Sequence, residues 1–167
     1  QTSKPYQCVY SNSPIDIDAQ ADDIIWKEAS SVPSFRIPGS DTLAKAPTHA
    51  KLAWDLDYFY FFAEMKDSHI IATKTKHDAA LWFEDVFEIF LRPSTKHQGY
   101  YEFQVSPKGT KFDIYWPHAE NRSDLFPKQL KAHEFNFDVA TATSKSAWTV
   151  EGRIRWRDLS MTGGRPA

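Results

Sequence analysis

The stretch that decides the fold is residues 81–91, which read LWFEDVFEIFL. Its second half alternates as a strand requires, because successive side chains of a strand point to opposite faces of a sheet. One face is apolar and is expected to lie in a core, and it consists of Phe87, Ile89 and Leu91. Glu88 then stands on the opposite face between apolar neighbours, where a carboxylate needs a partner.

A second strand is predicted at residues 100–105, after a turn that contains Gly99. Tyr101 and Phe103 face one side of this strand, and Glu102 and Gln104 face the other. Antiparallel pairing of the two strands can set Glu88 beside Gln104. The result is a strip of carboxylates and an amide with the indole of Trp82 at its end. Such strips suit sugars, since the hydroxyls need acceptors and donors while the C–H face of the ring stacks on an aromatic plane.

The rest of the chain repeats the pattern of short strands separated by turn residues. Residues 22–29 alone have an N-cap and helical spacing. Further strands are predicted at residues 13–18, 50–54, 58–64, 70–75, 111–116, 134–141 and 148–156. We therefore predict an all-β fold, an antiparallel, jelly-roll-like β-sandwich with one short helical turn. Val150 and Ile154 should join Tyr101 and Phe103 in its core.

Length, composition and charge indicate one globular domain that neither binds nucleic acid nor spans a membrane. The chain has 167 residues and 41% hydrophobic residues, which fits one globular domain. A net charge of -2 makes nucleic acid an unsuitable partner. The longest apolar run, Tyr58–Ala63, is too short to span a bilayer. A single cysteine, Cys8, excludes an internal disulfide. Polar residues 1–12 are interpreted as a leader or linker, and residues 13–167 as the domain.

The order and spacing of further stretches, over about residues 13 to 160, resemble those of the family 9 carbohydrate-binding modules. The matching stretches include Pro14–Asp18 with Trp26, Lys51–Asp55 with Tyr58–Tyr60, Ile71–Thr73, His77–Asp78, Leu81–Trp82, Asp85–Phe90, Tyr100–Phe103, Trp148–Glu151 and Trp156–Leu159. The resemblance implies a non-catalytic domain that binds an oligo- or polysaccharide. It also implies a secreted, cell-surface or periplasmic bacterial protein with further domains that degrade polysaccharide.

The resemblance also implies a binding site. Trp82 matches the first of two tryptophans that clamp the sugar, and Glu88 matches a hydroxyl-binding glutamate. Gln104 stands where the family has an arginine, which removes a fork of donors. The second clamp tryptophan lies near the family's C-terminus and has no counterpart here, so the domain is expected to be C-terminally incomplete or its site to be built differently.

Two further groove residues and a metal site complete the predictions. Glu102 shares the face of Glu88, and Trp116, which precedes Pro117 and a loop, is a candidate for an exposed ligand contact. Sugar binding should need no cofactor. The family carries structural calcium, and four carboxylates are candidates for it, although simple turn capping is the favoured interpretation: Asp16, Asp18, Asp55 and Asp57.

Two other classes of function are open to the sequence. A glycoside hydrolase needs two carboxylates flanking the bond. Asp85 and Glu88 would lie on opposite faces of their strand, whereas Glu88 and Glu102 could share one. A haem-binding redox domain of the same sandwich superfamily could use Met65 and His69, but the sequence has no Cys-x-x-Cys-His run.

Overall fold

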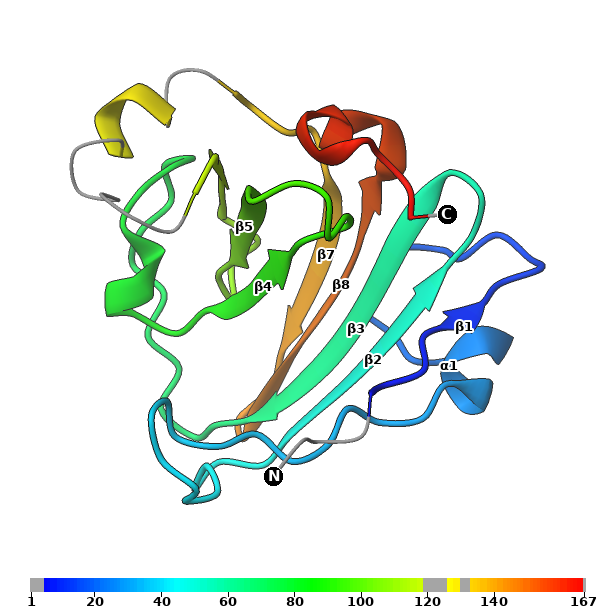
Figure 1. The fold of residues 1–167 in the computed structure, drawn as a ribbon. Coiled ribbons are helices and arrows are strands. Elements are labelled where there is room, and N and C mark those ends of the chain that lie inside the picture. The colour runs from blue at the N-terminus through cyan, green and yellow to red at the C-terminus, as the bar shows by residue number, and fades with distance from the viewer. Residues whose placement is uncertain (1–4, 119–125, 130–132, 167) are drawn as a thin grey trace.

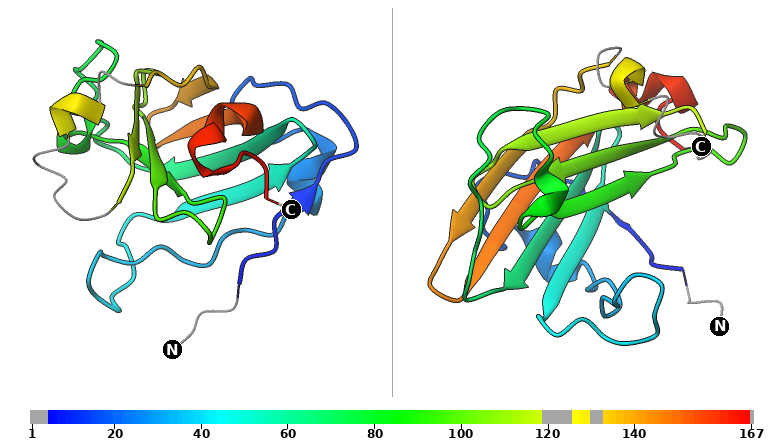
Figure 2. Two further views of the ribbon diagram at one scale, coloured as in Figure 1. Left: turned by 45° about the horizontal axis from the view of Figure 1, so that its top comes forward. Right: turned by 90° about the vertical axis from the view of Figure 1, so that its left-hand side faces the viewer.

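The chain folds into two facing β-sheets, and the computed structural model describes residues 5–118, 126–129 and 133–166. The larger sheet has the order β1-β2-β3-β8-β7 and the smaller one β4-β5-β6. Figures 1 and 2 show the two sheets as packed layers. All neighbouring strands are antiparallel except β1 and β2. The predicted antiparallel β-sandwich is confirmed. The strands are β1 (Val9–Tyr10), β2 (Thr48–Trp54), β3 (Tyr58–Lys66), β4 (Phe87–Leu91), β5 (Tyr100–Val105), β6 (Lys111–Trp116), β7 (Asp138–Thr143) and β8 (Ala147–Arg155).

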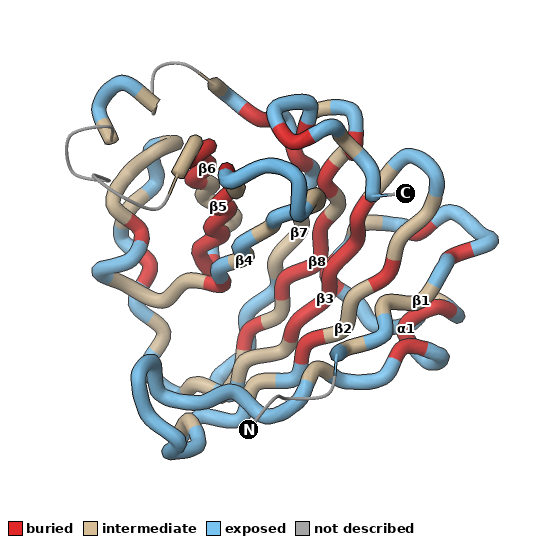
Figure 3. Tube along the Cα trace, in the orientation of Figure 1, coloured by how far each residue is buried: buried red, intermediate tan, exposed pale blue. Residues whose placement is uncertain are grey.

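Both sheets contribute aromatic and aliphatic side chains to one central core. Phe61 of β3 stacks on Phe87 of β4 across the interface, with ring centroids 5.9 Å apart. Of the residues predicted for this core, Ile89 and Leu91 are only partly buried against it, because β4 is an edge strand. The others are buried: Phe87, Tyr101, Phe103, Val150 and Ile154. Figure 3 shows buried residues gathered in β3, β5, β6 and β8.

The outer face of the larger sheet is covered by the N-terminal segment and the short helix α1 (Ile24–Glu28). Trp26 of α1 is fully buried there. The buried carboxylate of Glu151 on β8 fixes this segment. It accepts hydrogen bonds from the Trp26 indole at 2.7 Å and from the backbone N–H groups of Asp18 and Ala19 at 2.9 Å each. Burial raises the pKa of Glu151, and these three donors oppose that rise.

Three segments differ from the sequence-based expectation. Val9 and Tyr10, in the segment interpreted as a leader, pair with Ala53 and Trp54 and extend the larger sheet. Residues 13–18 form no strand, since their end is bonded to a side chain of β8 instead of a neighbouring strand. Residues 70–75 also form no strand, because their N–H groups are bonded to the carboxylates that follow the 3₁₀ turn η1 (Leu81–Phe83). A second 3₁₀ turn, η2 (Trp156–Thr162), follows β8.

Within the described ranges, every helix is too short or too polar to cross a bilayer.

Replacing Glu151 with alanine should leave three donors in a buried region without their acceptor. We expect the free energy of unfolding to fall by about 3 kcal/mol. Glu64→Ala is the control, because Glu64 makes a partly exposed ion pair with Lys66 and its loss should cost about 0.5 kcal/mol or less. Urea denaturation of both variants measures the difference. Equal stability of the two variants would show that Glu151 does not hold the N-terminal segment.

Candidate functional site

A groove of about 510 Å³ lies on the outer face of the smaller sheet. It brings together all five residues predicted to contact a ligand. Antiparallel pairing sets Glu88 directly opposite Gln104, as predicted, and Phe90 opposite Glu102. The groove is lined by Trp82, Glu88, Phe90, Glu102, Gln104, Phe112, Trp116 and Phe126.

The floor of the groove is a hydrogen-bonded network centred on Gln104, whose side chain is 0% exposed. Its amide nitrogen donates to Glu88 Oε1 at 2.7 Å and to Glu102 Oε1 at 2.9 Å. The indole of Trp116 donates to the other oxygen of Glu102 at 2.8 Å. Because both amide hydrogens are directed at carboxylates, Gln104 holds Glu88 and Glu102 in place instead of offering its own donors to a ligand.

Aromatic rings form the wall of the groove on the β6 side. Trp82 projects from η1 with 42% of its surface exposed, as predicted. Its ring lies edge-on to the rings of Phe112 and Phe126, with ring centroids 5.4 Å and 6.1 Å away. Phe126 in turn stacks on Trp116. The expectation that Trp116 is exposed is wrong: it is 3% exposed, because its indole N–H is bonded to Glu102 and its ring packs beneath Phe126.

Sequence reasoning missed three of the aromatic lining residues. Phe90 shares the face of Glu88 by simple alternation, so its position in the groove followed from the strand pattern. Phe112 likewise alternates with Asp113 on β6, and the outward face of that strand identifies it. Phe126 lies in a short helical segment, residues 126–129, far from any strand signal, and nothing in the sequence pattern places it over the groove.

The turn that carries Trp82 is held by the two carboxylates that follow it. Glu84 accepts hydrogen bonds from the backbone N–H and hydroxyl of Thr73 and from the N–H of Lys74. Asp85 accepts from the N–H of Ile71 at 2.6 Å. The Thr73 hydroxyl is the main cause that lowers the pKa of Glu84 to about 2. The carboxylates of Glu84 and Asp85 therefore anchor η1 to residues 71–74.

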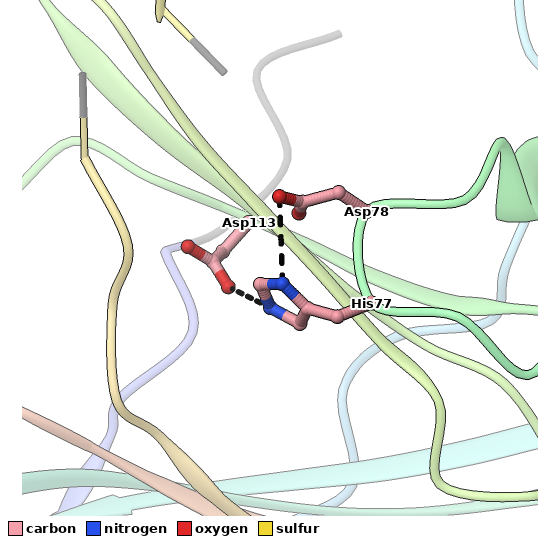
Figure 4. Close-up of side chains that lie close together, drawn as sticks. All are labelled: His77, Asp78 and Asp113. Atoms are coloured by element: carbon pink, nitrogen blue, oxygen red, sulfur yellow. Dashed lines mark hydrogen bonds and ion pairs between the residues drawn. The ribbon is translucent and has the colours of Figure 1, made fainter. Parts of the chain in front are cut away.

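A second anchor lies before η1, where His77 stands between Asp78 and Asp113 (Figure 4). Its Nε2 is 3.0 Å from Asp113, and its Nδ1 is 3.4 Å from Asp78. Within the described residues, this is the one group of three His, Cys, Asp or Glu side chains close enough to share a metal ion. A metal would bind only one ring nitrogen, whereas here each nitrogen faces a different carboxylate. The imidazole is therefore held by a hydrogen bond to Asp113 and by a close contact with the carboxylate of Asp78.

Asp113 makes this anchor part of the fold. Its side chain is buried on β6, and its second oxygen accepts the N–H of Phe135 at 2.8 Å. Burial is the main cause that raises the pKa of Asp113. The N–H of Asp78 also donates to the carbonyl of Lys111 on β6. The loop before Trp82 is thus fixed to the strand that forms the wall of the groove.

The four carboxylates predicted for calcium fall into two separate settings. Asp55 accepts the N–H groups of Asp57 and Tyr58 and the hydroxyl of Tyr60, so the β2–β3 turn uses both of its oxygens. This is the turn chemistry that the sequence left open. Asp18 accepts from the backbone and side chain of Gln20. Asp16 is exposed in the same N-terminal segment.

Of the residues weighed for other functions, Asp85, Met65 and His69 lie outside the groove. The carboxylate of Asp85 is bonded to Ile71 and does not line the groove. Met65 packs against the central core, and His69 is exposed after β3. Trp54 and Trp156 line a second hollow of about 260 Å³ together with Cys8, Phe59, Arg165 and Pro166. This hollow has no carboxylate or amide side chain in its described lining.

A sandwich with an aromatic-walled, carboxylate-floored groove on one sheet has the features of a carbohydrate-binding domain. Residues 17–166 match the model of the family described as carbohydrate family 9 binding domain-like, and the chain belongs to this family. Carbohydrate binding without catalysis, the function expected from the sequence, is confirmed at the level of the family.

Individual relatives are more distant. The chain is 26% identical over 165 residues to exoglucanase XynX of Acetivibrio thermocellus, a match that covers 97% of this chain and 13% of the exoglucanase. Two similar solved structures are family 9 modules of Caldicellulosiruptor kristjanssonii. The complex with cellotriose is 20% identical, with a TM-score of 0.62, over 88% of this chain and 65% of the other. The complex with glucose is 21% identical, with a TM-score of 0.62, over 89% and 68%. At these identities the likeness shows the fold.

The Glu84 anchor predicts a pH dependence of stability. Its pKa is about 2 in the folded chain and 4.5 in an ordinary exposed carboxyl, so folding favours the ionised form. Its contribution to stability is therefore complete above about pH 4.5 and is lost as the pH falls toward 2. Wild type should lose more stability between pH 5 and pH 3 than Glu84→Gln, as measured by urea midpoints at both pH values. An equal loss in the two proteins would contradict this role of Glu84.

Proposed function

We propose that the groove on the smaller sheet is the carbohydrate site of this domain. The observation that carries the proposal is the meeting of an exposed indole with two fixed carboxylates in one groove. The Trp82 ring offers an apolar plane for the C–H face of a pyranose. The exposed Glu88 offers acceptor oxygens to hydroxyl groups, while the buried Glu102 helps to fix the Gln104 amide that holds Glu88 in place. Trp116 contributes from beneath by fixing Glu102.

The division of roles follows from the geometry. Stacking on Trp82 depends on ring shape and is shared by many sugars, so it supplies affinity. Hydrogen bonds to a fixed carboxylate depend on where each hydroxyl lies, so Glu88 supplies selectivity. Since two similar domains were solved with glucose and cellotriose, we propose β-linked gluco-oligosaccharides as ligands of this groove.

The relative in Acetivibrio thermocellus suggests the setting. This chain corresponds to 13% of the length of that exoglucanase. We propose that the domain is an accessory module of a larger secreted bacterial protein that degrades polysaccharide. In that setting it holds the enzyme on its substrate, while separate domains carry out the hydrolysis.

Replacing the indole and the carboxylate should have different consequences. Trp82→Ala should weaken binding of cellotriose, xylotriose and laminaritriose alike, by about tenfold or more, because stacking contributes about 1–3 kcal/mol. Glu88→Ala should change the ranking of the three sugars. Calorimetric titration measures both effects. Phe83→Ala is the matched control, since Phe83 is 76% exposed beside Trp82 but does not line the groove. If wild type binds a sugar and Trp82→Ala binds it equally well, the groove is not the site.

We propose that sugar binding in the groove needs no metal ion. None of the four carboxylates predicted to hold calcium lines the groove: Asp16, Asp18, Asp55 and Asp57. EDTA should therefore leave the sugar affinity unchanged and lower the melting temperature at most. A loss of sugar binding on EDTA treatment, measured by calorimetry, would contradict the proposal that binding needs no metal.

A further inference from the structure

The groove contains a second exposed aromatic ring besides Trp82. Phe90 lies on β4, on the same face as Glu88, and 54% of its surface is exposed. Two other lining rings, Phe112 and Trp116, are buried. Among the lining rings on β4, β5, β6 and η1, Trp82 and Phe90 are therefore the exposed ones. A half-exposed phenylalanine on a sheet face leaves apolar surface in water, and a contact with a ligand would cover it.

The two rings stand at opposite sides of the polar floor. Trp82 contacts Phe112 of β6, whereas Phe90 lies on β4, beyond the intervening strand β5. Adjacent strands are about 4.8 Å apart, so β4 and β6 are separated by about 10 Å. Two strand spacings exceed the size of one pyranose ring. Glu88 lies two residues from Phe90 on β4, and Glu102 lies opposite Phe90 on β5.

Neighbouring contacts hold Phe90 in position. Its ring lies against Tyr100 of β5, with centroids 6.1 Å apart and planes tilted by 55°. β4 is an edge strand of the smaller sheet, so Phe90 lies on its outermost strand. An aromatic ring that packs against a neighbour and is still half-exposed can serve as a stacking surface.

We infer that Phe90 is a second sugar-stacking residue and that the groove binds a chain of at least two linked pyranose rings, one on Trp82 and one on Phe90, crossing β6, β5 and β4. This inference rests on the proposed function. It assigns a second subsite, on Phe90, that a single sugar unit bound to Trp82 would leave empty. The affinity should therefore depend on the length of the sugar chain.

The test is calorimetric titration of glucose, cellobiose and cellotriose into wild type, Phe90→Ala and Phe35→Ala. Phe35 is also partly exposed but lies outside the groove, so its variant is the matched control. Wild type should bind cellobiose and cellotriose more tightly than glucose. Phe90→Ala should lower the affinity for the two longer sugars by about 3- to 10-fold and for glucose by less than about twofold.

Other outcomes separate the two proposals. If Phe90→Ala weakens glucose and cellotriose equally, or weakens neither, the second subsite is wrong while the proposed function stands. If wild type binds none of the three sugars, the proposed ligand class fails and the subsite with it. Should Phe90→Ala not fold, Phe90→Leu keeps the apolar volume without the ring and is expected to show the same loss for the longer sugars. Full affinity of Phe90→Leu for cellotriose would overturn the stacking role.

Discussion

The structure depends on the two-residue period of the smaller sheet, because that sheet separates an aromatic core from a polar groove. Phe87 and Phe103 must face the larger sheet to complete the core. Alternation then forces Glu88 and Gln104 to the outer face, and antiparallel pairing sets them side by side. A shift of one residue would bury the carboxylate and expose the aromatic rings. The stability of the core therefore fixes the register of the site.

Hydrogen bonds between neighbouring side chains make the site rigid. The carboxylates of Glu88 and Glu102 need donors, and one buried amide serves both. The exposed indole of Trp82 needs support, and its turn is anchored on both sides, through Glu84 and Asp85 after it and through His77 and Asp113 before it. Little of the site has to become ordered when a ligand arrives, so less binding energy is lost to ordering. The same anchors explain why the chain uses so many acidic residues near one turn.

Sequence reasoning was sufficient where alternation and burial act together. It predicted the pairing of Glu88 with Gln104, the inward face of β4 and β5, and the exposed position of Trp82. It was insufficient where a side chain competes with a strand for backbone N–H groups. The β-branched residues 70–75 bond to Glu84 and Asp85, and residues 13–18 end on Glu151, so neither stretch is a strand. The burial of Trp116 depends on Phe126 and Glu102, which no local pattern connects to it.

The central claim is that sugar binds on the outer face of the smaller sheet, over Trp82, and not in the hollow beside Trp54 and Trp156. The chain has six tryptophans, so a titration with cellotriose can be followed at six indole N–H signals in a ¹H–¹⁵N correlation spectrum. The account predicts that the signals of Trp82 and Trp116, which line the groove, shift. The other four signals should stay in place: Trp26, Trp54, Trp148 and Trp156. Shifts at Trp54 and Trp156 with an unchanged Trp82 signal would contradict it.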